Sequence, residues 1–202
     1  MPGFLKFSVS DLTQAAVFAA LIVVLGIPGA FNLASGIPIT LQTLGVMLAG
    51  AVLGPRKGTL AVVIFMVLAL VGLPILAGWI NGMTSLATPG RGGFFLGFLP
   101  GAFVIGVLTA FMMPRYRIWL GVIANFLGGV VVIYLCGIPY YMVAADLPFS
   151  VVMGYMTPYL TGDVIKAVIA ALVAAGIHRG RPGLIAPLRL RRNQFSRHAD
   201  PA

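Results

Sequence analysis

The sequence of 202 residues lacks several of the side chains on which catalytic and metal sites are usually built. Glutamate is absent, and the four acidic residues are Asp11, Asp146, Asp163 and Asp200. So few carboxylates leave little material for paired-carboxylate catalysis or for a carboxylate metal site. Cys136 is the single cysteine, which excludes an internal disulfide and a four-cysteine metal site.

Short catalytic motifs are missing as well. The two histidines, His178 and His198, lie at the end of the last apolar segment and in the tail that follows it, so a histidine dyad within the membrane is excluded. The sequence contains neither a zinc-protease histidine motif, nor a hydrolase nucleophile elbow, nor a phosphate-binding loop. We therefore expect a protein that is not an enzyme and needs no cofactor. If it concentrates a solute, the energy has to come from a partner or an ion gradient.

Charge is scarce and hydrophobic residues are abundant. Charged residues make up 8% of the chain, against about 25% in an average soluble domain, and hydrophobic residues make up 60%. A transmembrane helix needs about 20 mostly apolar residues. The sequence predicts six such helices, at approximately 11–30, 39–54, 58–78, 93–113, 117–140 and 159–178. The expected fold class is an all-α, polytopic protein embedded in the lipid bilayer.

The net charge of +9 indicates how the chain crosses the membrane. Basic residues cluster at position 6, at 56–57, at 115–117 and at 179–197. Six crossings place all four clusters on one side, which the positive-inside rule makes cytoplasmic, with both termini. Basic segments that flank apolar spans meet anionic headgroups, so we do not expect nucleic-acid binding. Arg91 and Lys166 are the two basic residues outside these clusters.

The predicted spans divide the chain into two parts. Residues 1–178 form a transmembrane domain, and residues 179–202 form a basic cytoplasmic tail that is predicted to be disordered. The two longest connections, 78–92 and 141–158, lie on the outer side. Both are predicted to close over a pocket.

Ionisable residues inside a membrane are costly and often mark function. Asp163 and Lys166 lie three positions apart, so they share one face of the last predicted helix. One interpretation is a structural ion pair that fixes helix packing. The other is a ligand site, because a carboxylate beside an ammonium offers both an acceptor and a donor to an amide- or urea-like group. The two interpretations are compatible.

Arg91 lies among glycines in an outer loop. It is either a solvated loop residue or a clamp for an anionic group, because a guanidinium matches a carboxylate in a bidentate fork. Buried amides can hold helices together instead of binding a ligand, and outer aromatic residues can belong to the interfacial belt. With those alternatives open, the remaining candidate ligand-binding residues are Gln42, Trp79, Asn81, Asn125 and Tyr134.

The first predicted helix carries two overlapping pairs of small residues at a spacing of four. The pairs are Ala15 with Ala19 and Ala16 with Ala20. Such pairs allow another helix to approach closely. The spacing leaves open whether the partner helix is internal or belongs to another protein.

Several motifs together resemble the BioY family, the biotin-specific S components of energy-coupling factor (ECF) transporters. The resemblance extends over about residues 11–178. Its motifs are LQTLGVMLAG at 41–50 with LGPR at 53–56, GLP at 72–74, the glycine-rich loop at 89–93 and PYLTGDVIK at 158–166. Asp163 and Lys166 match an aspartate and a lysine of the family, which implies that they contact the ligand.

The resemblance implies an S-component fold and high-affinity biotin uptake across the cytoplasmic membrane of a prokaryote. The implied partners are a transmembrane coupling protein, which docks on an alanine surface of the first helix, and two ATPase subunits. For the ligand, we expect Asp163 near the ureido ring and Arg91 near the carboxylate. The alternative function is a self-sufficient, proton-coupled secondary transporter of a small anionic vitamin, with Asp163 as the proton site.

Overall fold

The computed structural model describes residues 7–27, 31–32 and 38–187, and this part of the chain is mainly helical. A two-residue antiparallel pair, β1 (Phe31–Asn32) and β2 (Pro38–Ile39), is the one small sheet among these residues. The helices are α1 (Val9–Val24), α2 (Gln42–Leu70), α3 (Gly82–Ala87), α4 (Gly92–Met112), α5 (Ile118–Phe126), the π-helix η1 (Leu127–Val132), α6 (Ile133–Ala145) and α7 (Phe149–Gly180). The predicted all-α fold is confirmed.

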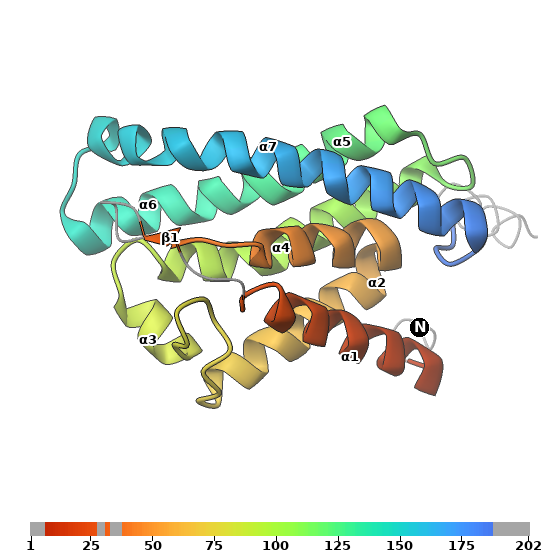
Figure 1. The fold of residues 1–202 in the computed structure, drawn as a ribbon, viewed down its shortest axis with the longest axis horizontal. Helices are drawn as coiled ribbons and strands as arrows, with labels where there is room; N and C mark the ends of the chain where they lie inside the picture. The colour runs from red at the N-terminus through yellow and green to blue at the C-terminus, as the bar shows by residue number, and fades with distance from the viewer. Residues whose placement is uncertain (1–6, 28–30, 33–37, 188–202) are drawn as a thin grey trace, which may run out of the picture.

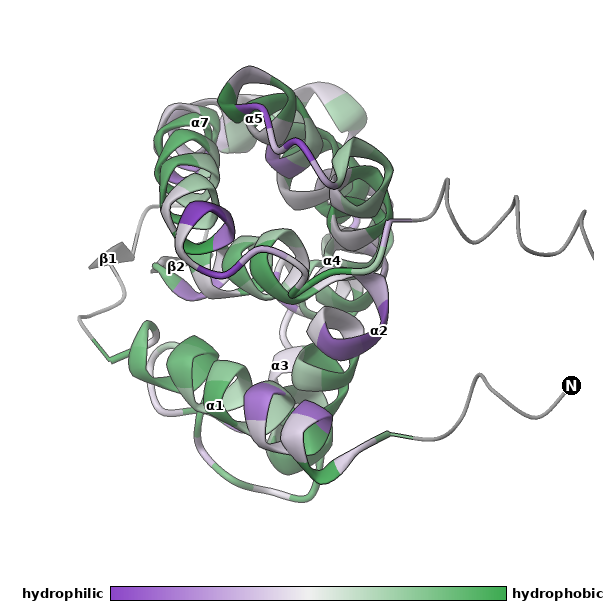
Figure 2. Ribbon diagram, turned by 90° about the vertical axis from the view of Figure 1, so that its right-hand side faces the viewer, coloured by the Kyte–Doolittle hydropathy of each residue, from purple (hydrophilic) through white to green (hydrophobic). Residues whose placement is uncertain are grey.

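The long helices run along the length of the molecule (Figure 1). Four of them are long and apolar enough to cross a membrane: α2, α4, the continuous helix formed by α5, η1 and α6, and α7. With 16 residues, α1 is shorter but also apolar. Large hydrophobic side chains are exposed on the outer faces of α1, α2 and α4 to α7, and Figure 2 shows these helices as predominantly hydrophobic. Such a surface is suited to contact with lipid.

A sharp reversal inside α2 separates two of the predicted spans. Gly54 has a φ of +77° and Pro55 follows it, so the helix is broken into two segments at this point. Glycine adopts this left-handed conformation without the steric cost that a side chain would add. The predicted spans 39–54 and 58–78 therefore correspond to the two halves of α2, except that the helix ends at Leu70 and residues 71–78 are not helical. With the halves counted separately, the described residues form six long helical segments, which agrees approximately with the six predicted helices.

The prediction for the second outer loop, 141–158, is wrong. The α6 helix continues to Ala145 and α7 begins at Phe149, so the connection shrinks to residues 146–148. Asp146 ends α6 in a left-handed conformation, and Pro148 in extended conformation precedes α7. Pro158, which directly precedes the predicted span 159–178, lies inside α7. A loop of three residues cannot form the second predicted lid.

The basic residues that the structure describes in these clusters meet at one end of the molecule. The start of α1, the reversal of α2, the turn between α4 and α5 and the end of α7 lie at the right of Figure 1. Contacts hold these parts together: Lys57 Nζ lies 3.9 Å from Asp11, and the rings of Tyr116 and His178 are 5.2 Å apart. Lys6 of the first cluster lies outside the described residues. The common location agrees with an even number of crossings, and the assignment of this end to the cytoplasm stays a prediction.

Residues after the predicted boundary at 178 continue the last helix. α7 extends to Gly180, and the following segment packs against the same end. Ile185 is buried beside Ala110 and Met113, and the backbone oxygen of Leu184 accepts a hydrogen bond of 3.1 Å from Lys57 Nζ. Residues 188–202 lie outside the described part of the chain.

The packing of α1 decides between the two alanine registers. Ala15 and Ala19 are buried on the side of α1 that packs against α2, whereas Ala16 and Ala20 are exposed. Only the second pair is therefore available to another protein.

Candidate binding pocket

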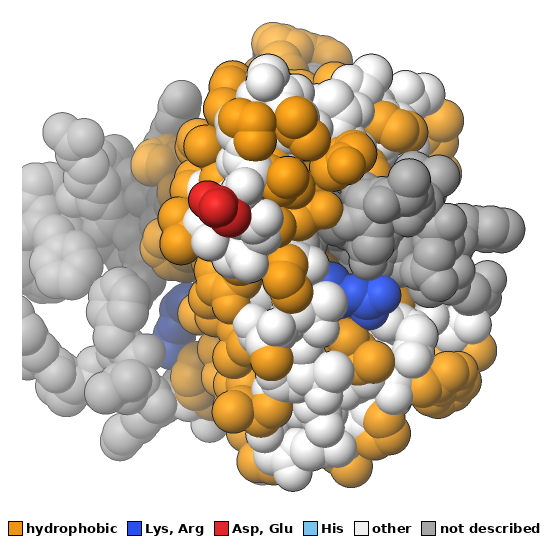
Figure 3. Space-filling model, turned by 90° about the vertical axis from the view of Figure 1, so that its left-hand side faces the viewer, with side chains coloured by type: hydrophobic (Ala, Val, Ile, Leu, Met, Phe, Trp, Pro, Cys, Tyr) orange, Lys and Arg blue, Asp and Glu red, His pale blue; other side chains and the backbone are white. Residues whose placement is uncertain are grey.

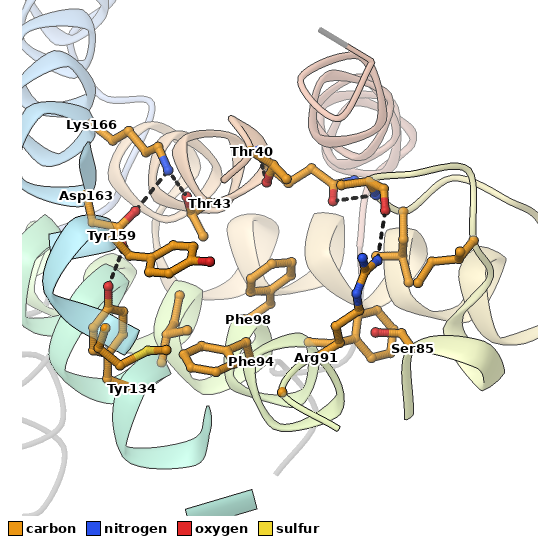
Figure 4. A pocket seen from close by; sticks show the side chains of 18 residues that line it. Thr40, Thr43, Ser85, Arg91, Phe94, Phe98, Tyr134, Tyr159, Asp163 and Lys166 are labelled. Atoms are coloured by element: carbon orange, nitrogen blue, oxygen red, sulfur yellow. Dashed lines mark hydrogen bonds and ion pairs between the residues drawn. The ribbon is translucent and has the colours of Figure 1, made fainter. Parts of the chain in front are cut away.

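A pocket lies in the half of the molecule opposite the basic end. Its 18 lining residues come from the start of α2, the segment 76–91 and helices α4, α6 and α7 (Figure 4). Its empty space is about 720 Å³, a volume that includes the open space at its mouth. The matching end face is covered mainly by hydrophobic and uncharged side chains, with few charged atoms (Figure 3).

One side of the pocket is built around a buried ion pair. Lys166 Nζ lies 2.9 Å from Asp163 Oδ1, and it donates a hydrogen bond of 3.0 Å to Thr43 Oγ1. Tyr134 donates a hydrogen bond of 2.8 Å from its hydroxyl to the other carboxylate oxygen of Asp163. Four side chains from three helices, α2, α6 and α7, thus converge as adjacent donors and acceptors. The sequence prediction that Asp163 and Lys166 share a face is confirmed by this geometry.

Arg91 stands on the opposite side of the same pocket (Figure 4). Its Nη1 donates a hydrogen bond of 3.2 Å to the backbone oxygen of Ala77. Gln42 fixes the segment that carries this oxygen, because its side chain donates to Ile75 O at 3.0 Å and accepts from Ala77 N at 3.1 Å. Burial lowers the pKa of Arg91, and a bound anion would offset that cost by favouring the charged form.

Apolar side chains separate the two polar sides. Phe94 and Phe98, one helical turn apart on α4, lie between them in Figure 4. Phe94 also packs edge-on against Tyr134, with 5.7 Å between ring centroids. The arrangement suits a small molecule with three parts: a head that both donates and accepts hydrogen bonds, an apolar middle and an anionic end.

With this geometry in place, comparison with known proteins identifies the family. A family-wide sequence profile described as "BioY family" matches residues 3–183. The chain belongs to the BioY family. It is 40% identical to "Biotin transporter BioY" of Rhizobium etli over 87% of this chain and 96% of that protein. It is also 40% identical to the protein of the same description from Rhodobacter capsulatus, with the same two coverages.

A solved structure supports the same assignment. It is described as the S component for biotin from an ECF-type ABC transporter, and it superposes with a TM-score of 0.81 at 30% sequence identity. The match covers 87% of this chain and 94% of that one. This BioY chain therefore has the S-component fold. Its relatives are named as transporters, so membership of the family points to transport and not to catalysis.

The connection between α2 and α4 of the BioY chain contains α3 and borders the pocket. Asn81 accepts a hydrogen bond of 2.8 Å from Thr84 N and so caps the start of α3. Tyr140 of α6 donates a hydrogen bond from its hydroxyl to the backbone oxygen of Leu86 near the end of α3. The α3 segment is thereby attached to the helices that form the pocket, and its Ser85 lines the cavity.

The structure brings five of the eight predicted ligand-binding residues together and leaves three apart. Gln42, Arg91, Tyr134, Asp163 and Lys166 line the pocket. Trp79, Asn81 and Asn125 are not part of its lining. Trp79 is 69% exposed, Asn81 caps α3, and the buried Asn125 donates to the backbone oxygen of Gly121 within its own helix. These three side chains therefore lie apart from the other five: two are engaged in local hydrogen bonds with the backbone, and Trp79 is largely exposed.

Sequence reasoning also missed residues that line the pocket. Met156 and Tyr159 lie on the same face of α7 as Asp163 and Lys166, at helical spacings of three and four. The spacing is visible in the sequence, but the predicted span begins at residue 159 and so leaves Met156 outside the helix. Phe94 and Phe98 show the corresponding spacing on α4.

Proposed function

We propose that this chain captures biotin from the outer side of the membrane, as the S component of an ECF transporter. The observation that carries the proposal is the pocket with a donor–acceptor network on one side, Arg91 on the other and aromatic rings between them. Biotin has a ureido ring, an apolar thioether bicycle and tail, and a carboxylate, in that order. The names of the relatives and of the solved structure support the same ligand.

The geometry suggests an orientation for the ligand. The carboxylate of Asp163 can accept hydrogen bonds from the ureido N–H groups, and Lys166 or Thr43 can donate to the ureido oxygen. Phe94 and Phe98 would contact the apolar bicycle. Arg91 would then meet the carboxylate as a charge-assisted pair. In this arrangement Tyr134 positions Asp163, and Gln42 positions the segment that supports Arg91.

The proposal includes partners and a location. ATP hydrolysis would come from two ATPase subunits, through a transmembrane coupling protein that docks on Ala16 and Ala20. The exposed position of this pair supports that surface. The location would be the cytoplasmic membrane of a prokaryote. The description of the solved relative as part of an ABC transporter favours this function over a self-sufficient proton-coupled carrier.

The binding test uses the purified chain, biotin and biotinamide, which has a neutral carboxamide in place of the carboxylate. We expect calorimetry to show at least about tenfold weaker binding of biotinamide, because a hydrogen bond to a charged group contributes about 1.5–3 kcal/mol. Arg91→Ala should weaken the binding of biotin and abolish the difference in affinity between biotin and biotinamide. Arg115→Ala, at an exposed arginine of the opposite end, is the matched control and should behave as the wild type.

Three results would contradict the proposal in different ways. Absence of biotin binding to folded protein would reject the ligand. An unchanged preference for biotin over biotinamide in Arg91→Ala would reject the role of Arg91. Full affinity in Asp163→Asn would reject the assignment of the ureido ring to the α7 side of the pocket.

The docking surface is tested separately from the ligand. Ala16→Trp and Ala20→Trp should reduce co-purification with the coupling protein at least tenfold, because a close helix contact has no room for an indole ring. Biotin binding should be unchanged. Leu172→Trp, at an exposed position of α7, is the control. Undiminished co-purification of both alanine variants would place the docking surface elsewhere.

A further inference from the structure

A second cavity lies at the basic end, far from the biotin pocket. It is bounded by the start of α1, the reversal of α2, the middle of α4 and the segment 183–186. None of its lining residues belongs to the first pocket. The groove therefore has no part in the ligand binding proposed above.

Positive charge dominates one side of this groove. Arg56 and Lys57 line it, and the Arg56 guanidinium lies 5.2 Å from the centre of the Phe7 ring. Lys57 is held in place by Gln14 at 2.8 Å and by Leu184 O at 3.1 Å. Asp11 is the one acidic residue of the lining, and its carboxylate lies 3.9 Å from Lys57 Nζ. One carboxylate beside two cations leaves a net positive charge.

The other side of the groove is apolar and continues onto the lipid-facing surface. Leu53 and Ile185 form buried parts of the wall, and Phe103 of α4 is 50% exposed. Leu96 and Phe111 are exposed on the same helix at spacings of seven and eight from Phe103, so they share its face. Figure 2 shows this end with hydrophilic residues of α1 and α2 beside a largely hydrophobic α4. The groove thus joins a cationic rim to an apolar helix face.

We propose that this groove binds one anionic phospholipid of the adjoining leaflet. The phosphate would lie against Arg56 and Lys57, and an acyl chain would follow α4 past Phe103. Basic pockets between helices at a membrane surface recognise anionic headgroups in this way. A zwitterionic lipid would bring a second, positive group to a rim that already carries net positive charge. Only an anionic lipid satisfies both sides of the groove.

The test is native mass spectrometry of the full-length chain in detergent, titrated with dioleoyl phosphatidylglycerol or dioleoyl phosphatidylcholine. We expect one phosphatidylglycerol to bind at least about tenfold more tightly than phosphatidylcholine. Arg56→Gln should weaken the binding of phosphatidylglycerol about fivefold, which corresponds to about 1 kcal/mol per basic residue near the lipid surface. Arg115→Gln removes an exposed arginine at the same end but outside the groove, so it should change nothing.

Each alternative result overturns the proposal. Equal affinity for the two lipids would show that the groove does not distinguish an anionic from a zwitterionic headgroup. Equal losses in Arg56→Gln and Arg115→Gln would indicate general surface attraction and not this groove. Competition by soluble glycerol phosphate as strong as that by the lipid would show that the apolar side takes no part. Unchanged biotin binding by Arg56→Gln confirms that the variant is folded.

Discussion

At the scale of single residues, Asp163 and Lys166 form a buried ion pair that also lines the pocket. The two residues are 5% and 7% exposed, and their charged atoms are 2.9 Å apart. Burial of an ion pair costs solvation, and good geometry with further hydrogen bonds is needed to offset it. Thr43 and Tyr134 supply those bonds here. The sequence allowed two compatible interpretations, a structural ion pair and a ligand site. A buried pair that also lines the pocket is consistent with both.

The two roles can be separated by a pair of variants. Lys166→Met leaves the Asp163 carboxylate buried without its cation, so it should destabilise the protein by about 3–5 kcal/mol. The double variant Asp163→Asn, Lys166→Met removes both charges and should recover most of that loss, since a neutral pair has no unpaired charge. Thermal unfolding in detergent measures the stability, and calorimetry measures biotin binding.

Binding should not recover with stability. The double variant lacks both the carboxylate acceptor and the ammonium donor, so we expect biotin affinity to stay at least a hundredfold below the wild type, about two charge-assisted hydrogen bonds. Recovery of binding together with stability would mean that the pair only supports the fold.

At the scale of elements, α2 and α4 are held together by close backbone contact. A side-chain carbon added at Gly106 of α4 would lie 2.5 Å from the backbone nitrogen of Pro55, at the reversal of α2. Backbone atoms cannot rotate away as a flexible side chain can. The absence of a side chain at residue 106 is therefore what allows α4 to pack against the reversal.

Gly106→Ala should consequently push the two helices apart and destabilise the protein by about 1–3 kcal/mol. Gly176→Ala on α7 is the matched control, because nothing lies within 4 Å of the added carbon. Alanine favours the helix over glycine by about 1 kcal/mol, so the control should be neutral or slightly stabilising. Thermal unfolding of both variants in the same detergent decides the matter, and equal melting temperatures would contradict the close contact of α4 with the reversal.

At the scale of the whole molecule, charge and ligand site are segregated. The described members of the basic clusters gather at one end, and the biotin pocket opens toward the other half. The positive-inside rule predicts that the basic end lies in the cytoplasm. A pocket that faces outward is then the arrangement that an uptake protein needs to collect its substrate.

The orientation can be measured by cysteine labelling of intact cells. In a Cys136→Ala background, Asp146→Cys at the α6–α7 turn should react with a membrane-impermeant maleimide added outside. Arg115→Cys, at the opposite end, should react only after the cells are opened. Both native residues are exposed at turns between helices, so accessibility alone does not distinguish them. The reverse labelling pattern would invert the predicted topology and place the pocket on the cytoplasmic side.

The sequence by itself determined the class of the molecule and most of its helices. Scarce charge and long apolar runs require a lipid environment, because water cannot solvate so much apolar surface. The spacing of three in Asp163 and Lys166 required a shared helix face. The family resemblance rested on local motifs, and the family comparison confirmed it. These are local properties that need no knowledge of the packing.

Only the tertiary structure decided which polar residues share a pocket. Gln42, Arg91 and Tyr134 come from different segments, and no sequence spacing relates them to Asp163. Asn125 is equally polar and equally helical, yet its amide donates within its own helix and takes no part in the pocket lining. Helix rotation and the reversal at Gly54 determine these outcomes, and both depend on contacts between residues far apart in the chain.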